Sequence, residues 1–283
     1  MTREYAARIR KGDPHDPLLR QVLPLEAELQ PVEGFTADAV GDQKAALTAG
    51  LLHKYDGRAL MVATGACAVH CRYCFRRHFP YHDLPRSPQA WKAPLAHLAA
   101  DSSIREIILS GGDPLTLVDA QFAWLAGKLA EIEHLQRVRV HTRLPIVIPQ
   151  RVTDELVATL CESRLTPIVV VHVNHPREID EDVSRALARL IDAGIPTLNQ
   201  AVLLAGVNDD VETLSELSER LVDLRVLPYY LHQLDRVSGA AHFEVSVERG
   251  KQLIAELRAR VPGYAVPRYV QEVAGATSKT ILA

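Results

Sequence analysis

A repeat of about 30 residues constrains the fold of this 283-residue chain more than any other feature. Apolar, β-branched runs recur at this interval, which is typical of one strand followed by one helix. The runs begin near Ala59, Arg105, Arg137, Pro167, Thr197 and Val226. The first interval is longer because it contains an insertion rich in cysteine. The pattern therefore predicts six strand–helix units.

Helical periodicity fills the intervals, with apolar residues at three- and four-residue steps. The predicted helices cover residues 88–99, 119–132, 153–161, 178–193, 210–224 and 246–260. Side-chain oxygens at Thr153, Asp210 and Ser246 are placed to cap three of these helices at their N-termini. Six alternating units of this kind are typical of an α/β domain.

The strands are apolar almost without interruption, so we expect both faces of a parallel sheet to be covered. Residues 59–283 are long enough for six units, and eight would need more chain. We therefore predict a partial (β/α)6 barrel of one domain, with a Rossmann-like doubly wound sheet as the alternative. Residues 1–58 contain several prolines and predict a short helix followed by an irregular lead-in packed on the barrel.

Charge and hydropathy exclude several functional classes. The net charge of -3 gives no basic surface for nucleic acid, and no apolar run is long enough to cross a bilayer. The first residues are charged and lack the apolar core of a signal peptide. We expect a soluble cytoplasmic protein, in a compartment that keeps thiols reduced.

Three of the four cysteines, Cys67, Cys71 and Cys74, follow the first predicted strand. Three residues separate the first two and two residues separate the last two, which suits an iron–sulfur cube with one iron left open. A structural zinc site is the alternative, although such sites almost always take four protein ligands. We expect Cys161, in a predicted helix, to pack as a small apolar side chain.

Other polar side chains also follow predicted strands. They are Gly111, Gly112 and Asp113 after the second strand, Arg143 after the third, His172 and Asn174 after the fourth, Gln200 within the fifth, and Asp235 after the sixth. Parallel barrels build active sites at the carboxyl ends of their strands, so this distribution favours an enzyme over a binding scaffold. Arg143 receives no role from the sequence.

The cysteine motif CxxxCxxC, with Tyr73 before its last cysteine, resembles the radical S-adenosylmethionine (SAM) superfamily. A wider set of segments resembles the lysine 2,3-aminomutase family, closest to the branch that makes (R)-β-lysine for elongation factor P. These segments read GACAVHCRYCFRRHFPY, SGGDPL, RLPIVIPQR, HVNHPREI, LNQAVLL and YYLHQLDRVSGAAHF. The resemblance implies an isomerase that converts L-lysine to (R)-β-lysine with a [4Fe-4S] cluster, SAM, pyridoxal 5′-phosphate and an external electron donor. That branch carries a further N-terminal segment, so we expect Met1 to be a late start or a trimmed end.

The resemblance assigns roles to individual residues. Cys67, Cys71 and Cys74 would bind the cluster, and Lys279 would bind pyridoxal phosphate covalently. Residues expected around the two organic cofactors are Lys54, Tyr55, Arg58, Gly111, Gly112, Asp113, His172, Asn174 and Gln200. The substrate carboxylate would meet Arg76, and its side-chain ammonium would meet Asp235 and Glu272.

The sequence departs from the family at three positions. Lys54 stands where the lysine aminomutase has an arginine, Glu272 where it has an aspartate, and Asp210 where it has a zinc-binding cysteine. We therefore expect no zinc, and a homo-oligomer stays open. Two rival functions remain: an aminomutase for glutamate, which the acidic pair opposes, and a catalytically inactive module that binds a cluster or zinc.

Overall fold

One open sheet of ten strands organises the computed structural model, which describes residues 1–84 and 90–283. The strands are β1 (Ala46–Thr48), β2 (Leu51–Tyr55), β3 (Arg58–Thr64), β4 (Glu106–Gly111), β5 (Arg137–Thr142), β6 (Thr166–Val171), β7 (Thr197–Val202), β8 (Leu227–His232), β9 (Arg268–Gln271) and β10 (Thr280–Ile281). Their spatial order follows the chain, and β3 to β9 pair in parallel. No reversal of strand order occurs among the described strands, so the doubly wound alternative is wrong and the partial barrel is confirmed.

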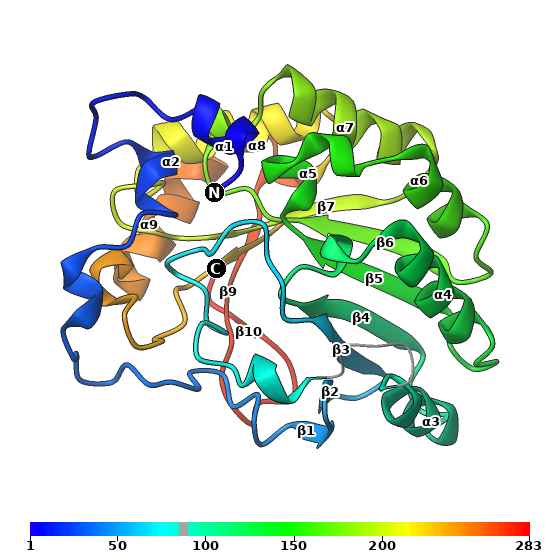
Figure 1. The fold of residues 1–283 in the computed structure, drawn as a ribbon. Coiled ribbons are helices and arrows are strands. Elements are labelled where there is room, and N and C mark those ends of the chain that lie inside the picture. Colours follow the sequence, from blue (N-terminus) through cyan, green and yellow to red (C-terminus); the bar gives the residue numbers. More distant parts are fainter. Residues whose placement is uncertain (85–89) are drawn as a thin grey trace.

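Helices cover the outer face of this curved sheet, as Figure 1 shows for α3, α4, α6 and α7. The helices are α1 (Arg3–Ala7), α2 (Pro17–Arg20), α3 (Lys92–Ala100), α4 (Asp119–Ala130), α5 (Leu144–Val147), α6 (Asp154–Cys161), α7 (Glu181–Asp192), α8 (Val211–Asp223) and α9 (Val247–Arg258). Single-turn 3-10 helices lie at Glu26–Leu29, Tyr81–Asp83, Pro114–Thr116, Pro149–Arg151, Pro176–Glu178, Ala241–Phe243 and Gly263–Ala265.

The six predicted strands coincide with β3 to β8, and the six longer helices lie where periodicity placed them. The predicted start of the first of these helices, at residue 88, lies outside the described residues. Side chains of Thr153, Asp210 and Ser246 accept hydrogen bonds from the first turns of α6, α8 and α9, so these three caps are confirmed. Asp210, at the family's zinc position, thus serves as a helix cap here.

Four strands were not predicted. The antiparallel strands β1 and β2 extend one edge of the sheet and arise from the lead-in, which is therefore less irregular than expected. At the other edge, β9 has four residues and β10 has two, too short for an apolar period to register. The helix predicted from residue 178 begins at Glu181 instead, because Asp180 caps it while Glu178 is wholly buried.

Alternation along the strands separates a dry layer from a polar one. In β5, for example, Val138 and Val140 are buried in the apolar core beneath the helices, whereas Arg139 and His141 line the inner cavity. The largest apolar cluster lies on the outer side, where strands β3 to β6 meet α3, α4, α6 and α7. The concave side is thus left to residues that can do chemistry.

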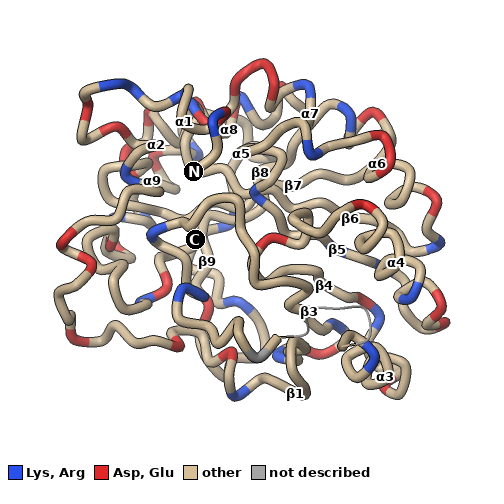
Figure 2. Tube along the Cα trace, in the orientation of Figure 1, with Lys and Arg blue, Asp and Glu red and all other residues tan. Residues whose placement is uncertain are grey.

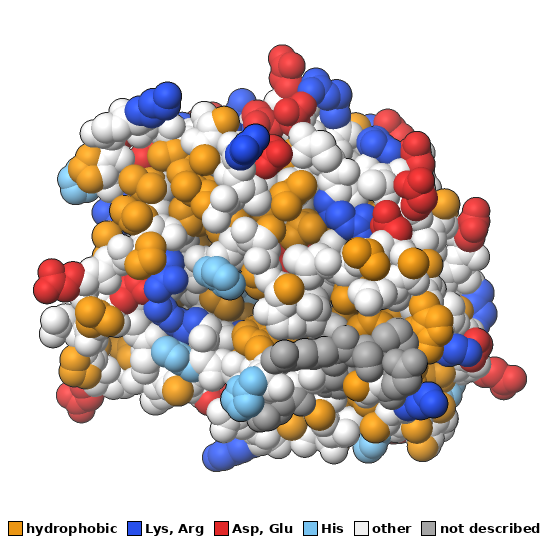
Figure 3. Space-filling model, in the orientation of Figure 1, with side chains coloured by type: hydrophobic (Ala, Val, Ile, Leu, Met, Phe, Trp, Pro, Cys, Tyr) orange, Lys and Arg blue, Asp and Glu red, His pale blue; other side chains and the backbone are white. Residues whose placement is uncertain are grey.

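The lead-in packs on the barrel through buried contacts. Tyr5 and Leu18 are both fully buried, and the Tyr5 hydroxyl donates to the carbonyl of Leu18 at 3.2 Å. Arg177, just before α7, forms an ion pair of 2.8 Å with the buried Asp16. Apolar side chains also gather on the surface over α2 in Figure 3. Leu23, which follows α2 in the chain, is exposed.

The outer surface carries both signs of charge. Lysines, arginines and acids are interspersed along α6 and α7 in Figure 2, and Arg189 of α7 forms an ion pair with Asp154 of α6. Within residues 1–84 and 90–283, no helix has the length and apolar character that a bilayer span requires.

We predict that Gly250→Ala destabilises the fold, whereas Gly127→Ala does not. A Cβ at Gly250 in α9 would lie 2.2 Å from the hydroxyl oxygen of Tyr269 in β9, and such overpacking costs about 1–3 kcal/mol. Gly127 in α4 has open space around its Cα, so alanine there should stabilise the helix by up to about 1 kcal/mol. Urea unfolding of both variants measures the difference, and equal stability would contradict the close packing of α9 on β9.

Candidate active site

The strand ends surround a cavity of ≈ 910 Å³. All but one of the site residues predicted from the sequence line it. They are Lys54, Tyr55, Arg58, Cys67, Cys71, Cys74, Arg76, Gly111, Gly112, Asp113, His172, Gln200, Asp235, Glu272 and Lys279. The exception is Asn174, which is fully buried in the wall. The chain thus brings together residues more than 200 positions apart.

The three cysteines of the loop after β3 are free thiols, and each is half-buried. Burial raises the pKa of Cys67 to about 12 and that of Cys74 to about 11, so these thiols need a bound cation to become thiolates. Among the described residues, no three His, Cys, Asp or Glu side chains converge closely enough for a single metal ion. A cubane cluster does not require such convergence, because each cysteine binds a different iron.

Cys161, by contrast, ends α6, is exposed, and is not among the residues that line the cavity. The expectation that it packs as a small apolar side chain is therefore wrong. Its thiol lies 3.6 Å from the carbonyl of Ala193, at the outer surface.

Two glycines allow the end of β4 to cross the start of the cysteine loop. Gly111 has a φ of +117°, and a Cβ at Gly112 would lie 2.2 Å from the carbonyl oxygen of Ala66. The N–H of Gly112 donates to the carbonyl of Thr64 at 2.8 Å, and the N–H of Asp113 donates to Ala66 at 2.7 Å. The sequence GGDP thus fixes the cysteine loop against β4 as well as bordering the cavity.

Asp113 joins the ends of two strands. Its carboxylate accepts hydrogen bonds from the N–H groups of Leu115, Arg143 and Leu144 and from the hydroxyl of Thr142. Burial raises its pKa to about 6 against the lowering effect of these donors. Its side chain therefore supports the loops after β4 and β5 from the edge of the cavity.

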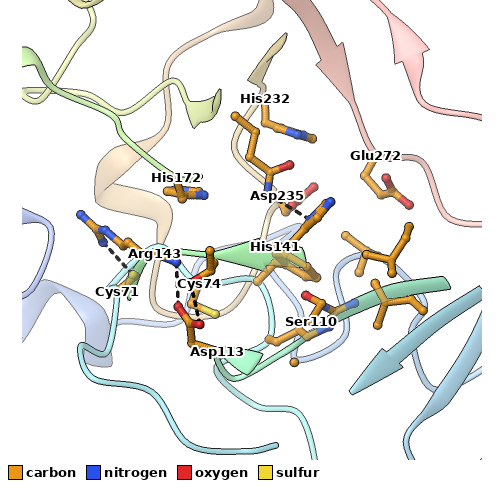
Figure 4. Close-up of a pocket in the computed structure, with 18 of the residues that line it drawn as sticks. Cys71, Cys74, Ser110, Asp113, His141, Arg143, His172, His232, Asp235 and Glu272 are labelled. Atoms are coloured by element: carbon orange, nitrogen blue, oxygen red, sulfur yellow. Dashed lines mark hydrogen bonds between the residues drawn. The ribbon is translucent and has the colours of Figure 1, made fainter. Parts of the chain in front are cut away.

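Three imidazoles surround the same space in Figure 4: those of His141, His172 and His232. Burial lowers the pKa of all three, that of His172 to about 3, so the rings are neutral. The Nε2 atoms of His141 and His172 are buried without a partner among the described residues. Gln200 lies 3.5 Å from Nδ1 of His141. These atoms offer hydrogen bonds to a ligand that the protein itself leaves unused.

Asn174 is buried behind the residues that line the cavity, where it links three segments of the chain. Its amide nitrogen donates to the side-chain oxygen of Gln21 at 3.0 Å and to the hydroxyl of Tyr73 at 2.7 Å, and its oxygen accepts from the N–H of Val202 at 2.8 Å. Asn174 therefore ties the cysteine loop to the lead-in and to β7 behind the cavity surface.

Asp42, from the lead-in, holds two cations of the cavity. Its carboxylate lies 2.6 Å from Nε of Arg76 and 2.6 Å from Nζ of Lys54. Nη1 of Arg76 contacts the Ser110 hydroxyl at 3.3 Å, and Nη2 has no protein partner within the described part of the chain. Burial raises the pKa of Asp42, but Arg76 and Lys54 outweigh burial and leave that pKa below its usual value.

Lys279 lies on the C-terminal segment between β9 and β10, and its ammonium contacts the carboxylate of Glu272. Glu272 also accepts a hydrogen bond of 2.5 Å from the Tyr55 hydroxyl and lies 3.7 Å from Nζ of Lys54. The guanidinium of Arg58 lies 4.6 Å from the centre of the Tyr55 ring. A primary amine, two further cations and an aromatic ring thus share one end of the cavity.

Asp235 follows β8 and lies near this group (Figure 4). Burial raises its pKa to about 7; Lys279 opposes this shift and Glu272 reinforces it. No described residue donates a hydrogen bond to its carboxylate. Asp235 is therefore an acid with capacity for a cationic ligand.

Sequence reasoning missed His141 and Asp42. His141 had a detectable signal, because Arg137, Arg139 and His141 alternate with valines along β5 and predict one polar face. Asp42 had none, since it lies in the lead-in and meets Arg76 only through the tertiary fold.

We predict that Asp42→Asn lowers the free energy of unfolding by about 2–4 kcal/mol, because two partly buried cations lose their shared anion. Urea unfolding at neutral pH measures this loss, with Asp101→Asn at an exposed turn as the control. The folded-state pKa of Asp42 is depressed, so its contribution exists above the unfolded pKa and disappears as pH falls through the folded one. A wild-type and variant difference that persists at low pH would contradict the ion-pair account.

Comparison with known sequences places the chain in a family. Residues 61–217 match the Radical SAM superfamily. A protein of Haemophilus influenzae named L-lysine 2,3-aminomutase is 48% identical over 279 residues, covering 99% of this chain and 82% of the relative. The Escherichia coli protein of the same name is 47% identical over 280 residues, with the same two coverages.

Among solved structures, SuiB of Streptococcus suis bound to its precursor peptide SuiA superposes with a TM-score of 0.57 at 13% identity. The match covers 74% of this chain and 46% of SuiB, and it shows the shared fold alone. The sequence identities show the family, which the likeness of folds alone does not, and the cysteine loop and the strand-end cavity agree with it. The chain belongs to the radical SAM superfamily, whose members use a [4Fe-4S] cluster and SAM, and within it to the L-lysine 2,3-aminomutase family of isomerases.

Proposed function

We propose that this protein converts L-lysine to (R)-β-lysine as a SAM- and pyridoxal phosphate-dependent aminomutase. One observation supports the proposal above others: a single cavity has three cysteine thiols at one end and the Lys279 ammonium, with acids beside it, at the other. A radical generator and an amino-group carrier must share one enclosed space for hydrogen transfer.

The residues present suit both groups of cofactors. When bound, the cluster and SAM would supply radical removal of hydrogen from carbon, and pyridoxal phosphate would supply delocalisation of an unpaired electron and a carrier for the amino group. Cys67, Cys71 and Cys74 would hold the cluster, and Lys279 would hold pyridoxal phosphate. SAM would lie beside Gly111, Gly112, Asp113, His172 and Gln200, with Asn174 supporting this wall from behind.

Side chains that line the cavity would orient the substrate and the cofactor. Nη2 of Arg76 has no partner among the described residues, and Asp42 and Ser110 hold the other two nitrogens, so Arg76 could donate to the substrate carboxylate without losing its position. Lys54 and Arg58 add positive charge suited to the cofactor phosphate, and Tyr55 offers a ring.

Asp235 and Glu272 would bind the ε-ammonium of the substrate. Burying that cation without anions would be costly, so two carboxylates select lysine over an amino acid with an acidic side chain. Glu272 already contacts Lys279, Tyr55 and Lys54, and these contacts support a role for it between the proposed cofactor and substrate sites.

The central test is anaerobic reconstitution with iron, sulfide, SAM, pyridoxal phosphate and a low-potential reductant, followed by chiral product analysis. L-lysine should yield (R)-β-lysine, and L-glutamate should not react. Lys279→Ala should abolish turnover. It should also prevent borohydride from attaching pyridoxal phosphate covalently to the chain, which the cofactor's absorption band would report. Lys251→Ala, on the exposed face of α9, should leave both properties intact. A wild-type protein with intact cluster and bound pyridoxal phosphate that makes no β-lysine would overturn the proposal.

Substrate affinity should depend on pH through Asp235. With its pKa at about 7, the carboxylate gains charge as pH rises through neutrality, while the substrate ammonium stays protonated because its pKa is about 10.4. The KM for L-lysine should therefore fall as pH rises from about 6 to about 8, and Asp235→Asn should raise KM and flatten this dependence. The nearby charges of Lys279, Glu272, Lys54 and Asp42 are unchanged in that variant. An unchanged KM profile in Asp235→Asn would exclude the residue from ammonium binding.

We further propose that the product supplies the modification of elongation factor P. The support is the sequence resemblance to that branch, together with the two relatives at 47% and 48% identity. Mass spectrometry of elongation factor P incubated with its ligase and the enzymatic product would detect the added β-lysyl group, and an unmodified protein would speak against this destination.

A further inference from the structure

Arg143 is a buried cation that the proposed mechanism does not use. Arg143 is 7% exposed, lies at the end of β5 and borders the cavity beside the cysteine loop. Nη1 donates to the sulfur of Cys71 at 2.7 Å, the contact drawn in Figure 4. Among the three cysteines, Cys71 is the one whose sulfur receives a side-chain hydrogen bond from a described residue.

The other side of the guanidinium is fixed by three acceptors. Nη2 donates at 2.7 Å to Glu178 and at 2.7 Å to Gln21, and it lies 3.2 Å from the Tyr5 hydroxyl oxygen. The planar group also lies over the rings of Tyr5 and Tyr73, at 5.4 and 5.8 Å. These contacts come from the lead-in, the cysteine loop and the segment after β6, so they leave the guanidinium little freedom to move.

Glu178 balances this cation and is 0% exposed. Its second oxygen accepts from the N–H groups of Asn174 and His175 and from the Gln21 amide. These hydrogen bonds fix the orientation of the carboxylate. Its negative charge therefore acts on the Arg143 guanidinium and, through it, on Cys71. Cysteine sulfur, guanidinium and carboxylate form a buried series of alternating charge once Cys71 is a thiolate.

We propose that Arg143 and Glu178 set the reduction potential of the iron–sulfur cluster through Cys71. The inference rests on the proposed assignment of Cys67, Cys71 and Cys74 to that cluster. Arg143 would act as a positioning and electrostatic residue, through its contact with Cys71.

Electrostatics gives the direction of each contribution. The cluster takes up one electron from an external reductant and gains one negative charge, with no proton or bond change at Arg143. A fixed cation beside a cluster sulfur favours the reduced form and raises the potential, and a fixed anion behind that cation lowers it. Burial strengthens both effects, because little water screens them.

Midpoint potentials of reconstituted clusters, measured without SAM by anaerobic titration followed by electron paramagnetic resonance, test the inference. Arg143→Gln should lower the potential by at least the equivalent of about tenfold in the reduction equilibrium, about 59 mV for one electron. Glu178→Gln should raise it, and Arg143→Lys, which keeps the charge, should stay close to wild type. Arg164→Gln is the control, because Arg164 binds backbone carbonyls on the outer surface.

The opposite signs separate electrostatics from a structural role, since mere loosening of the wall would move both variants the same way. Shifts in one direction, or no shift in either variant, would overturn the inference. If Arg143→Gln fails to hold a cluster, the upward shift of Glu178→Gln and the near-native value of Arg143→Lys still decide it. A wild-type protein that binds no cluster would refute the cysteine assignment itself, whereas a normal cluster with unmoved potentials refutes this inference alone.

Discussion

Parallel pairing of β3 to β9 is the constraint on which the site depends. The register aligns Thr64 with Gly111, Thr142 with Val171, and Val202 with His232, so the strands end at one edge of the sheet. The segments that follow these strand ends therefore surround one common cavity. The cysteine loop, the two glycines after β4 and the three cavity histidines are neighbours for this reason, although they lie far apart in the sequence.

The same constraint explains what could be predicted from the sequence. Apolar runs at a regular interval specified six strands, and parallel strands imply a shared carboxyl edge. Motifs placed after those runs, such as the cysteines or the glycines at 111 and 112, could then be assigned to one site before any coordinates were known. Residues with a local signal and a position on a regular element were thus accessible.

Residues outside the regular strands and helices could not be assigned from the sequence in this way. Asp42, Tyr5 and Gln21 belong to the lead-in, where no period links one residue to the next, and their partners are set by tertiary packing. Apolar periodicity predicted a helix from Glu178 onward, yet Glu178 lies before the helix and is buried against Arg143. The site's supporting charges therefore come from the least regular segments, which sequence patterns describe poorly.

Three of the cations that border the cavity, Arg76, Lys54 and Lys279, are oriented by acids. Asp42 fixes Arg76 and Lys54, and Glu272 contacts Lys279. These ion pairs were formed during folding, so the side chains are already aligned when a ligand arrives. Binding then reorganises few dipoles, which is the condition under which buried charges act most strongly on a reaction.

Lys279 lies next to β10, the shortest of the described strands, whereas the other predicted site residues lie in or follow longer strands. The strand β10 has two exposed residues and pairs with β9 alone, although the ladder continues from Leu282 to Tyr269 at 2.8 Å. Opening so short an edge breaks few hydrogen bonds and leaves the apolar core beneath the helices intact. Amide hydrogens of β10 should exchange with solvent long before those of β5 or β6, whereas Lys279 is held at the cavity by its ion pair with Glu272.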